Sequence, residues 1–73
     1  MSRAAAIGEE VRIAGYALAG VELLAAEDAG EARSAWERLS QDVACLIVTA
    51  RARDALGARL AERPRLVVAV MPE

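Results

Sequence analysis

The sequence predicts an α/β domain built on a four-stranded parallel sheet, and two observations lead to that class. Four short apolar runs recur along the 73 residues, and segments with helical character alternate with them. Such alternation favours βαβ units with right-handed crossovers. We expect one domain over 1–73, with strand order 2-1-3-4 and about three flanking helices, in a Rossmann-like or receiver-like layout.

The four apolar runs are the expected strands. The last two, "DVACLIVT" (42–49) and "RLVVAVMP" (65–72), are nearly continuous and rich in β-branched residues, which is typical of strands covered on both faces. "GVELLAA" (20–26) supplies another strand. "RAAAIG" (3–8) is the weakest of the four, because alanine disfavours strands. We therefore expect a sheet that is jacketed by helices on both faces.

The clearest helix is expected at 28–41, "DAGEARSAWERLSQ". Asp28 can cap its first turn, and Glu31 stands three residues later, as in a capping box. An apolar stripe follows at helical spacing, formed by Ala32, Trp36 and Leu39. Trp36 is the only tryptophan, and we expect it in the core because aromatic side chains dominate core burial. Another helix is expected at 50–63, and Pro64 directly after it should end it.

The remaining helix, about 9–19, is harder to orient. Helical spacing places one set of apolar residues toward the sheet, namely Val11, Ala14, Ala17 and Leu18. Tyr16 then falls almost opposite, among the small residues of "GYALAG" (15–20). Small residues let another backbone approach closely, and tyrosine is favoured at interfaces. The pattern leaves two interpretations open, a docking surface or a solvent-exposed tyrosine beside a helix-ending Gly20.

The composition argues against several classes of function. Net charge is −2, whereas nucleic-acid-binding domains present a basic face. No apolar run approaches the ~18 residues of a membrane span, and we expect neither a signal peptide nor direct membrane insertion. The chain holds no histidine, which removes the most common metal ligand and general base. Cys45 lies inside an apolar run, so we expect a small buried hydrophobic residue rather than a nucleophile.

Open α/β sheets bind ligands at the carboxyl ends of their strands, and the candidates are "IGEEV" (7–11) and "IVTAR" (47–51). The next glycine after Gly8 comes seven positions later, which fits neither nucleotide-binding glycine motif. Glu9 and Glu10 would repel a phosphate at the helix start, and a tight metal site needs more oxygen ligands than they offer. We therefore expect no catalytic residue, no cofactor and no metal.

A phosphoacceptor (receiver) domain has the same alternation of strands and helices. This sequence, however, lacks the residues that receivers use for phosphotransfer. Receivers also carry an acidic pair after the first strand, but they need an aspartate at the end of the third strand and a lysine after the fifth. Here Thr49 ends the third run, and the sequence contains neither a lysine nor a fifth apolar run. Phosphotransfer is therefore not expected.

One family is similar along essentially the whole chain. "AIGEEVRIAGYALAGVE" resembles the opening of the F subunit of the V-type/A-type ATPase, also called V-type ATP synthase. That family begins with a strand, a glycine and an acidic pair, and a Gly-aromatic-x-Leu-Ala-Gly stretch follows seven residues after the glycine. Gly8 and Gly15 have this spacing, and Tyr16 is the aromatic. "DVACLIVTARARDAL" and "RPRLVVAVMP" are similar to the family's threonine-ended strand with its charged helix and to its proline-ended last strand.

The resemblance implies a non-catalytic component of a rotary ATPase. Family members sit on the central stalk, bind the coiled-coil D subunit and turn with it. The hexameric head meanwhile hydrolyses or makes ATP, coupled to proton or sodium transport. Contacts with the connector C subunit and with the catalytic head are also implied, as is a cytoplasmic location, peripheral to the membrane through the complex. The family usually continues into a C-terminal helix, which we expect to be lacking here, so that 1–73 corresponds to the N-terminal globular domain.

The same resemblance favours the docking interpretation of 15–20. The expected interface, where the chain would meet the D subunit, consists of Arg12, Gly15, Tyr16, Ala19 and Gly20. The alternative is a receiver-like α/β regulatory module that binds another protein and has no phosphotransfer chemistry. A small enzyme is not expected, because the sequence offers no plausible pair of base and nucleophile.

Overall fold

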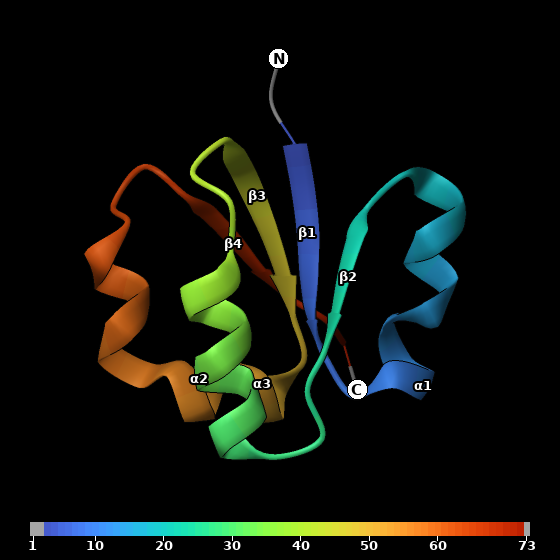
Figure 1. Cartoon of the computed structure of the whole chain (residues 1–73), viewed down its shortest axis with the longest axis horizontal. Coiled ribbons are helices and arrows are strands. Elements are labelled where there is room, and N and C mark those ends of the chain that lie inside the picture. Colours follow the sequence, from blue (N-terminus) through green and yellow to red (C-terminus); the bar gives the residue numbers. More distant parts are fainter. Residues whose placement is uncertain (1–2, 73) are drawn as a thin grey trace.

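The computed structural model of the chain describes residues 3–72, apart from the side chain of Leu18. All strands are parallel and lie in the order β2-β1-β3-β4 (Figure 1). Their bounds are β1 Arg3–Gly8, β2 Glu22–Ala25, β3 Val43–Val48 and β4 Val67–Val70. The structure confirms the predicted α/β class and the predicted strand order.

Two of the three expected helices are each divided into an α-helical part and a 3₁₀ part. The α-helices are α1 (Glu10–Ile13), α2 (Ala29–Arg38) and α3 (Ala50–Leu56). The 3₁₀ helix η1 (Ala14–Ala19) follows α1 directly, and η2 (Gly57–Glu62) follows α3. Gly57 has φ 50° at the second junction, a left-handed value that glycine adopts without steric cost. Pro64 stands just beyond η2, as predicted for the end of that helix.

The alanine-rich strand β1 occupies a central place in the sheet, although its propensity for strand structure is the weakest of the four. It pairs with β2 on one side and with β3 on the other. Ala5, Ala6 and Ile7 are fully buried. Small side chains on both faces let helices pack closely against this strand, and that burial outweighs the modest intrinsic preference of alanine.

The main core lies between the sheet and the pair α2–α3, on the near face in Figure 1. Trp36 is 3% exposed at its centre, as predicted. Its indole N–H donates to Glu62 Oε1 at 3.1 Å, and the Arg63 guanidinium lies 5.3 Å from the ring centroid. The polar edge of the ring therefore has a partner, which buried tryptophan usually requires.

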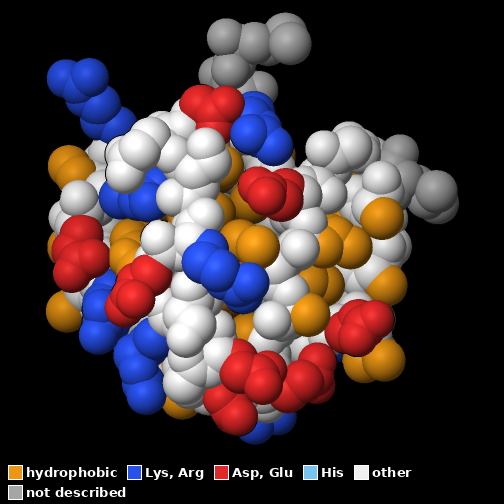
Figure 2. All heavy atoms as spheres, in the orientation of Figure 1, with side chains coloured by type: hydrophobic (Ala, Val, Ile, Leu, Met, Phe, Trp, Pro, Cys, Tyr) orange, Lys and Arg blue, Asp and Glu red, His pale blue; other side chains and the backbone are white. Residues whose placement is uncertain are grey.

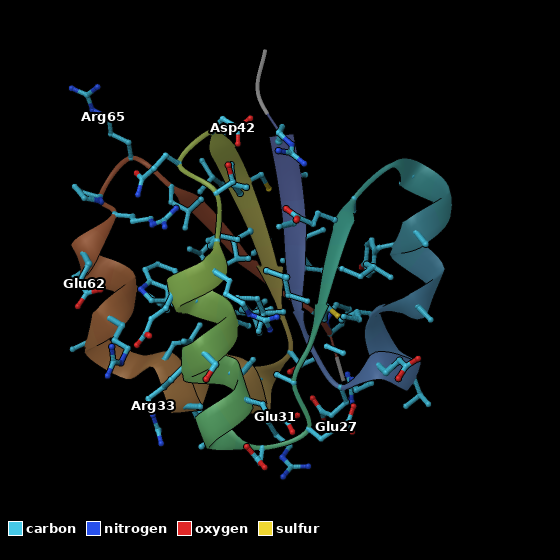
Figure 3. All side chains as sticks on the ribbon, viewed as in Figure 1. Glu27, Glu31, Arg33, Asp42, Glu62 and Arg65 are labelled. Carbon is cyan, nitrogen blue, oxygen red and sulfur yellow. The ribbon has the colours of Figure 1, made fainter. Side chains whose placement is uncertain are left out.

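The start of α2 has the predicted cap with one difference. Asp28 Oδ1 accepts a hydrogen bond from the Glu31 amide at 2.8 Å, as in a capping box. Glu31 Oε1 reaches back to the amide of Glu27, at 2.7 Å, rather than to that of Asp28. One amide of the first helical turn, that of Glu31, is thereby satisfied, as is the Glu27 amide just before the cap. Figure 3 shows Glu27 and Glu31 together at this end of the fold.

The opposite face of the sheet is only partly covered, which corrects the expectation of helices on both faces. The α1–η1 segment contacts β1 and β2, and Ile13 is fully buried there. Beyond it, Cys45 and Ile47 of β3 are half-buried. Val67 of β4 is 64% exposed. The physical reason is the connectivity, because among the described residues a single helical segment crosses this face and it spans only the β1–β2 connection.

Candidate protein-interaction surface

The orientation predicted for the first helix is wrong. Val11 is 89% exposed, and Ala14 and Ala17 are exposed as well. Ile13, which the prediction left aside, is fully buried and anchors the segment. The α-helical part ends at Ile13, and the 3₁₀ helix after it has three residues per turn, so the 3.6-residue spacing used to place the later residues does not apply.

The outer side of this segment is exposed and, apart from Glu10 at its start, carries small or apolar residues. We call it the α1–η1 ridge, made up of Val11, Ala14, Gly15, Ala17, Ala19 and Gly20. A 3₁₀ run of six residues is longer than usual. In Figure 2, charged side chains gather over α2 and α3, and the side of the molecule that carries α1 shows apolar and uncoloured atoms with an acidic side chain beside them.

The five residues predicted to form the interface fall into two groups. Gly15, Ala19 and Gly20 are exposed on the ridge. Tyr16 is half-buried, not turned fully away from the sheet as predicted. Arg12 is also half-buried, and its guanidinium donates to the carbonyl of Pro72 at 3.1 Å. Arg12 therefore ties the α1 segment to the chain that leaves β4, in addition to any contact with a partner.

The two glycines of the ridge differ in whether the local structure requires glycine. Gly20 closes η1 with φ 77°, a conformation that other residues rarely adopt. Gly15 has no positive φ, and a Cβ added there would have no other atom within 4 Å. Packing within the chain therefore does not require glycine at position 15. The space around this position is open in the chain itself.

One end of the ridge opens into a hollow of about 530 Å³. Ala19 and Gly20 contribute to its wall, and the other lining residues are Arg3, Ala4, Val21 and Glu22. The Arg3 guanidinium and the Glu22 carboxylate lie 3.9 Å apart. A partner that covers the ridge would thus meet an apolar surface along the helix and a pair of opposite charges at its end.

The carboxyl ends of β1 and β3, the usual ligand position in such a sheet, are filled by the chain's own side chains. Thr49 is 1% exposed. Its hydroxyl donates to Glu9 Oε1 at 2.9 Å and accepts from the Ala52 amide at 3.2 Å. A Cβ at Gly8 would lie 2.4 Å from Thr49 Cγ2 and 3.2 Å from Ile13 Cγ2. Glycine is required here because Thr49 and Ile13 close over the strand end.

The carboxylates near this edge are engaged by hydrogen bonds and arginines. Backbone hydrogen bonding at Glu9, followed by the hydroxyl of Thr49, holds the pKa of Glu9 below its ordinary value of 4.5. Arg51 lies 3.7 Å from Glu9 Oε2, and the Glu10 amide donates to Glu27 Oε2 at 2.9 Å. Within residues 3–72, no group of three or more Asp, Glu, Cys or His side chains is arranged to hold a metal.

Sequence reasoning brought Glu9, Glu10 and Thr49 to one edge correctly and missed Glu27. The contact between Glu27 and Glu10 spans 17 positions, and no local motif signals it. The exposed side of the α1–η1 segment was missed for a different reason, since the change from α to 3₁₀ geometry is not marked in the hydrophobic pattern. The glycine at position 15, inside the expected helix, was the one local signal that its geometry changes.

Comparison of the chain with protein-family models, with curated proteins and with solved structures found no match. Across residues 3–72, no helix has the length and apolar composition needed to cross a bilayer.

Proposed function

We propose that this chain is a non-catalytic protein-binding domain, the central-stalk F subunit of a V/A-type ATPase or ATP synthase. In this role it braces the coiled-coil D subunit through the α1–η1 ridge and supports proton or sodium transport coupled to ATP hydrolysis or synthesis. Contacts with the connector C subunit and the catalytic head, and a place in the cytoplasm at the membrane-bound complex, belong to the same proposal.

The observation that carries the proposal is where the family-like residues lie. The stretch "GYALAG", which is the more specific part of the resemblance to the F-subunit family, coincides with η1 and its closing Gly20. Its Gly15, Ala17 and Ala19 are exposed. Its Gly15 has no packing role within the chain. A residue that costs roughly 1 kcal/mol in a helix relative to alanine, with no internal reason for its presence, favours a surface shaped for another molecule.

The carboxyl edge of the sheet supports binding over catalysis. Thr49 is buried there with its hydroxyl both donating and accepting, and Gly8 is in contact with it. Glu9, whose pKa is lowered, is ionised at neutral pH and suits a structural hydrogen bond better than general acid chemistry. The edge therefore locks α1 onto the sheet and gives the ridge a rigid base.

The direct test is binding to the D subunit of the same ATPase. In a titration followed by calorimetry, the wild-type chain should form a one-to-one complex with the D subunit. Ala17→Arg and Ala19→Arg place a long charged side chain on the ridge and should each raise the dissociation constant at least about tenfold.

Ala58→Arg is the matched control, because Ala58 is an exposed alanine of a 3₁₀ helix that follows α3 rather than α1. It should bind the D subunit as the wild type does. Absence of any complex with the D subunit would contradict the stalk role, and equal binding by all variants would contradict the ridge as the contact surface.

A further inference from the structure

The 3₁₀ helix η1 follows α1 without a break in the helical backbone. It runs for six residues, Ala14–Ala19, although 3₁₀ runs longer than three or four residues are uncommon. At the junction, Ile13 and Ala14 both have right-handed helical dihedral angles. The Ala14 amide donates to the carbonyl of Glu10, four residues back, as in an α-helix. The geometry of α1 therefore leads directly into η1.

The other end of η1 is closed by hydrogen bonds of both helix types. The Gly20 amide is shared between the carbonyl of Ala17, three residues back, and that of Tyr16, four residues back. The Val21 amide donates to the same Tyr16 carbonyl at 3.4 Å. With φ 77° at Gly20, these bonds form the Schellman pattern in which helices commonly end. The closing turn is thus already suited to an α-helix.

The 3₁₀ helix η2 differs from η1 at both ends. Gly57, where α3 meets η2, has φ 50° and ψ −124°, which lies outside the helical region and interrupts an α-helix. At the far end of η2, the Arg63 amide donates to the Leu60 carbonyl, three residues back, at 3.4 Å. A break in the backbone therefore separates η2 from α3, whereas no such break separates η1 from α1.

The residues of η1 favour an α-helix with one exception. Four of the six are alanine or leucine, the strongest α-helix formers. The exception is Gly15, because glycine in a helix interior loses more conformational freedom than other residues do. Packing within the chain does not require glycine at this position. Its presence lowers the stability of an α-helix through 14–19 and so leaves the 3₁₀ form competitive.

Tyr16 provides the tertiary contact that favours the 3₁₀ form. With three residues per turn, Tyr16 lies in line with Ile13, which is fully buried where α1 contacts β1 and β2. Tyr16 is half-buried. In an α-helix it would turn about 60° away from that line, and Ala17 would come within about 40° of it. The 3₁₀ form therefore gains burial of the tyrosine, whereas the α-helical form gains better hydrogen bonds.

The distance that the segment must cover is compatible with both forms. Ala5 pairs with Glu22 at the start of β2, so the chain returns from Gly8 by three residues of strand, about 10 Å. The segment from Glu10 to Ala19 spans about 15 Å as one α-helix and about 18 Å with η1 in the 3₁₀ form. Conversion to an α-helix therefore leaves the connection to β2 intact.

We propose that η1 is a two-state segment, which is 3₁₀ in the free chain and becomes α-helical, continuous with α1, when a partner covers the α1–η1 ridge. In the free chain, water completes the weaker hydrogen bonds of the exposed 3₁₀ helix. A partner that covers the ridge removes this water, and the form with better internal hydrogen bonds then has the lower free energy. The inference rests on the proposed function for the identity of the partner, the D subunit.

The second form can be tested in the full chain without a partner. Backbone NOEs between residues i and i+2 mark a 3₁₀ helix, and those between i and i+4 mark an α-helix. Wild type should give the i, i+2 pattern across 14–19. Gly15→Ala should raise the ratio of α-helical to 3₁₀ form by up to about fivefold. Adding Tyr16→Ala removes the second influence that favours the 3₁₀ form, so the double variant should give the i, i+4 pattern.

Val11→Ala is the matched control, because it introduces alanine at an exposed position of α1 and should keep the wild-type pattern across 14–19. Circular dichroism confirms that the compared chains are folded. Gly15→Ala alone changes an open position and keeps the test available if the double variant does not fold. A folded Gly15→Ala chain without any gain in i, i+4 contacts would overturn the proposal.

Addition of the D subunit to the isotope-labelled chain tests the coupling to binding. In the complex, residues 14–19 should give i, i+4 contacts, while η2 keeps its 3₁₀ pattern. A complex in which 14–19 keep the i, i+2 pattern would also overturn the proposal. Absence of a complex would contradict the stalk role instead, and the Gly15→Ala comparison would then decide by itself whether η1 has a second form.

Discussion

Gly8 and Thr49 approach each other closely where β1 ends beside the start of α3. The Thr49 side chain cannot easily turn aside, because its hydroxyl bonds to both Glu9 and the Ala52 amide. Ile13 occupies the other side of Gly8. Because Gly8 has no Cβ, the end of β1 can pack directly against Thr49, the N-cap of α3, and against Ile13 of α1.

Gly8→Ala should destabilise the domain by about 1–3 kcal/mol, because the new methyl group would overlap Thr49 Cγ2. Gly15→Ala is the matched change at an open position with no positive φ. It should stabilise the isolated chain by about 0.4–1 kcal/mol, through a less flexible unfolded state. Urea unfolding of the two variants measures both, and equal effects would contradict the packing described for Gly8.

The lowered pKa of Glu9 links its hydrogen bonds to pH. A carboxylate whose pKa is depressed by folding adds stability that is fully present above its unfolded value, 4.5. That stability is lost as the pH falls through the folded value. The wild type should therefore exceed Glu9→Gln in stability by a constant amount near neutral pH, and the gap should narrow only as the pH falls below about 4.5 toward about pH 3.

Denaturant unfolding of both chains across this range measures the gap. Because the comparison is made within one background, the titration of Asp42, whose pKa the Ser40 hydroxyl and Arg3 also lower, cancels between the two chains. A gap that stays constant with pH would show that the carboxylate of Glu9 makes no net contribution as an anion.

At the scale of elements, what the sequence predicts depends on whether the signal is local. The cap formed by Asp28 and Glu31, the core position of Trp36 and the end of η2 before Pro64 all follow from residues a few positions apart. The orientation of the α1–η1 segment does not, because four α-helical residues are too few to define a stripe and the 3₁₀ continuation has another period. Burial of Ile13 decides the orientation, and that is a tertiary effect.

Truncation at neighbouring positions of α1 checks this orientation. Ile13→Ala removes a fully buried side chain and should cost about 2–5 kcal/mol. Val11→Ala changes a side chain that is 89% exposed and should alter stability by less than about 0.5 kcal/mol. Thermal or urea unfolding distinguishes them. A larger loss of stability for Val11→Ala than for Ile13→Ala would instead support the orientation expected from helical spacing, in which the ridge is buried.

At the scale of the whole molecule, the chain is a sheet with one face well covered and the other covered over half its width. Strand order and parallel pairing could be predicted, because alternating strands and helices leave few right-handed arrangements. The bare part of β3 and β4 could not, because an apolar run such as "RLVVAVMP" has the same pattern whether its cover comes from this chain or from another. The coverage depends on how many helices cross each face.

A domain of 73 residues has a small core and gains stability from any partner that binds its folded state. The α1–η1 ridge is the surface on which we propose such binding. In the proposed stalk role, the chain would act as a rigid block, because α1 is fixed to the sheet through Ile13 and Thr49 while its outer side is left to the partner.

Amide hydrogen exchange of the chain, alone and with the D subunit, tests the central claim most directly. The account predicts slower exchange within residues 10–20 when the D subunit is added, with Ala58→Arg showing the same pattern and Ala17→Arg losing it. Unchanged exchange across the chain in the presence of this partner, or protection confined to 43–48 and 67–70, would contradict the claim that the α1–η1 ridge grips the stalk.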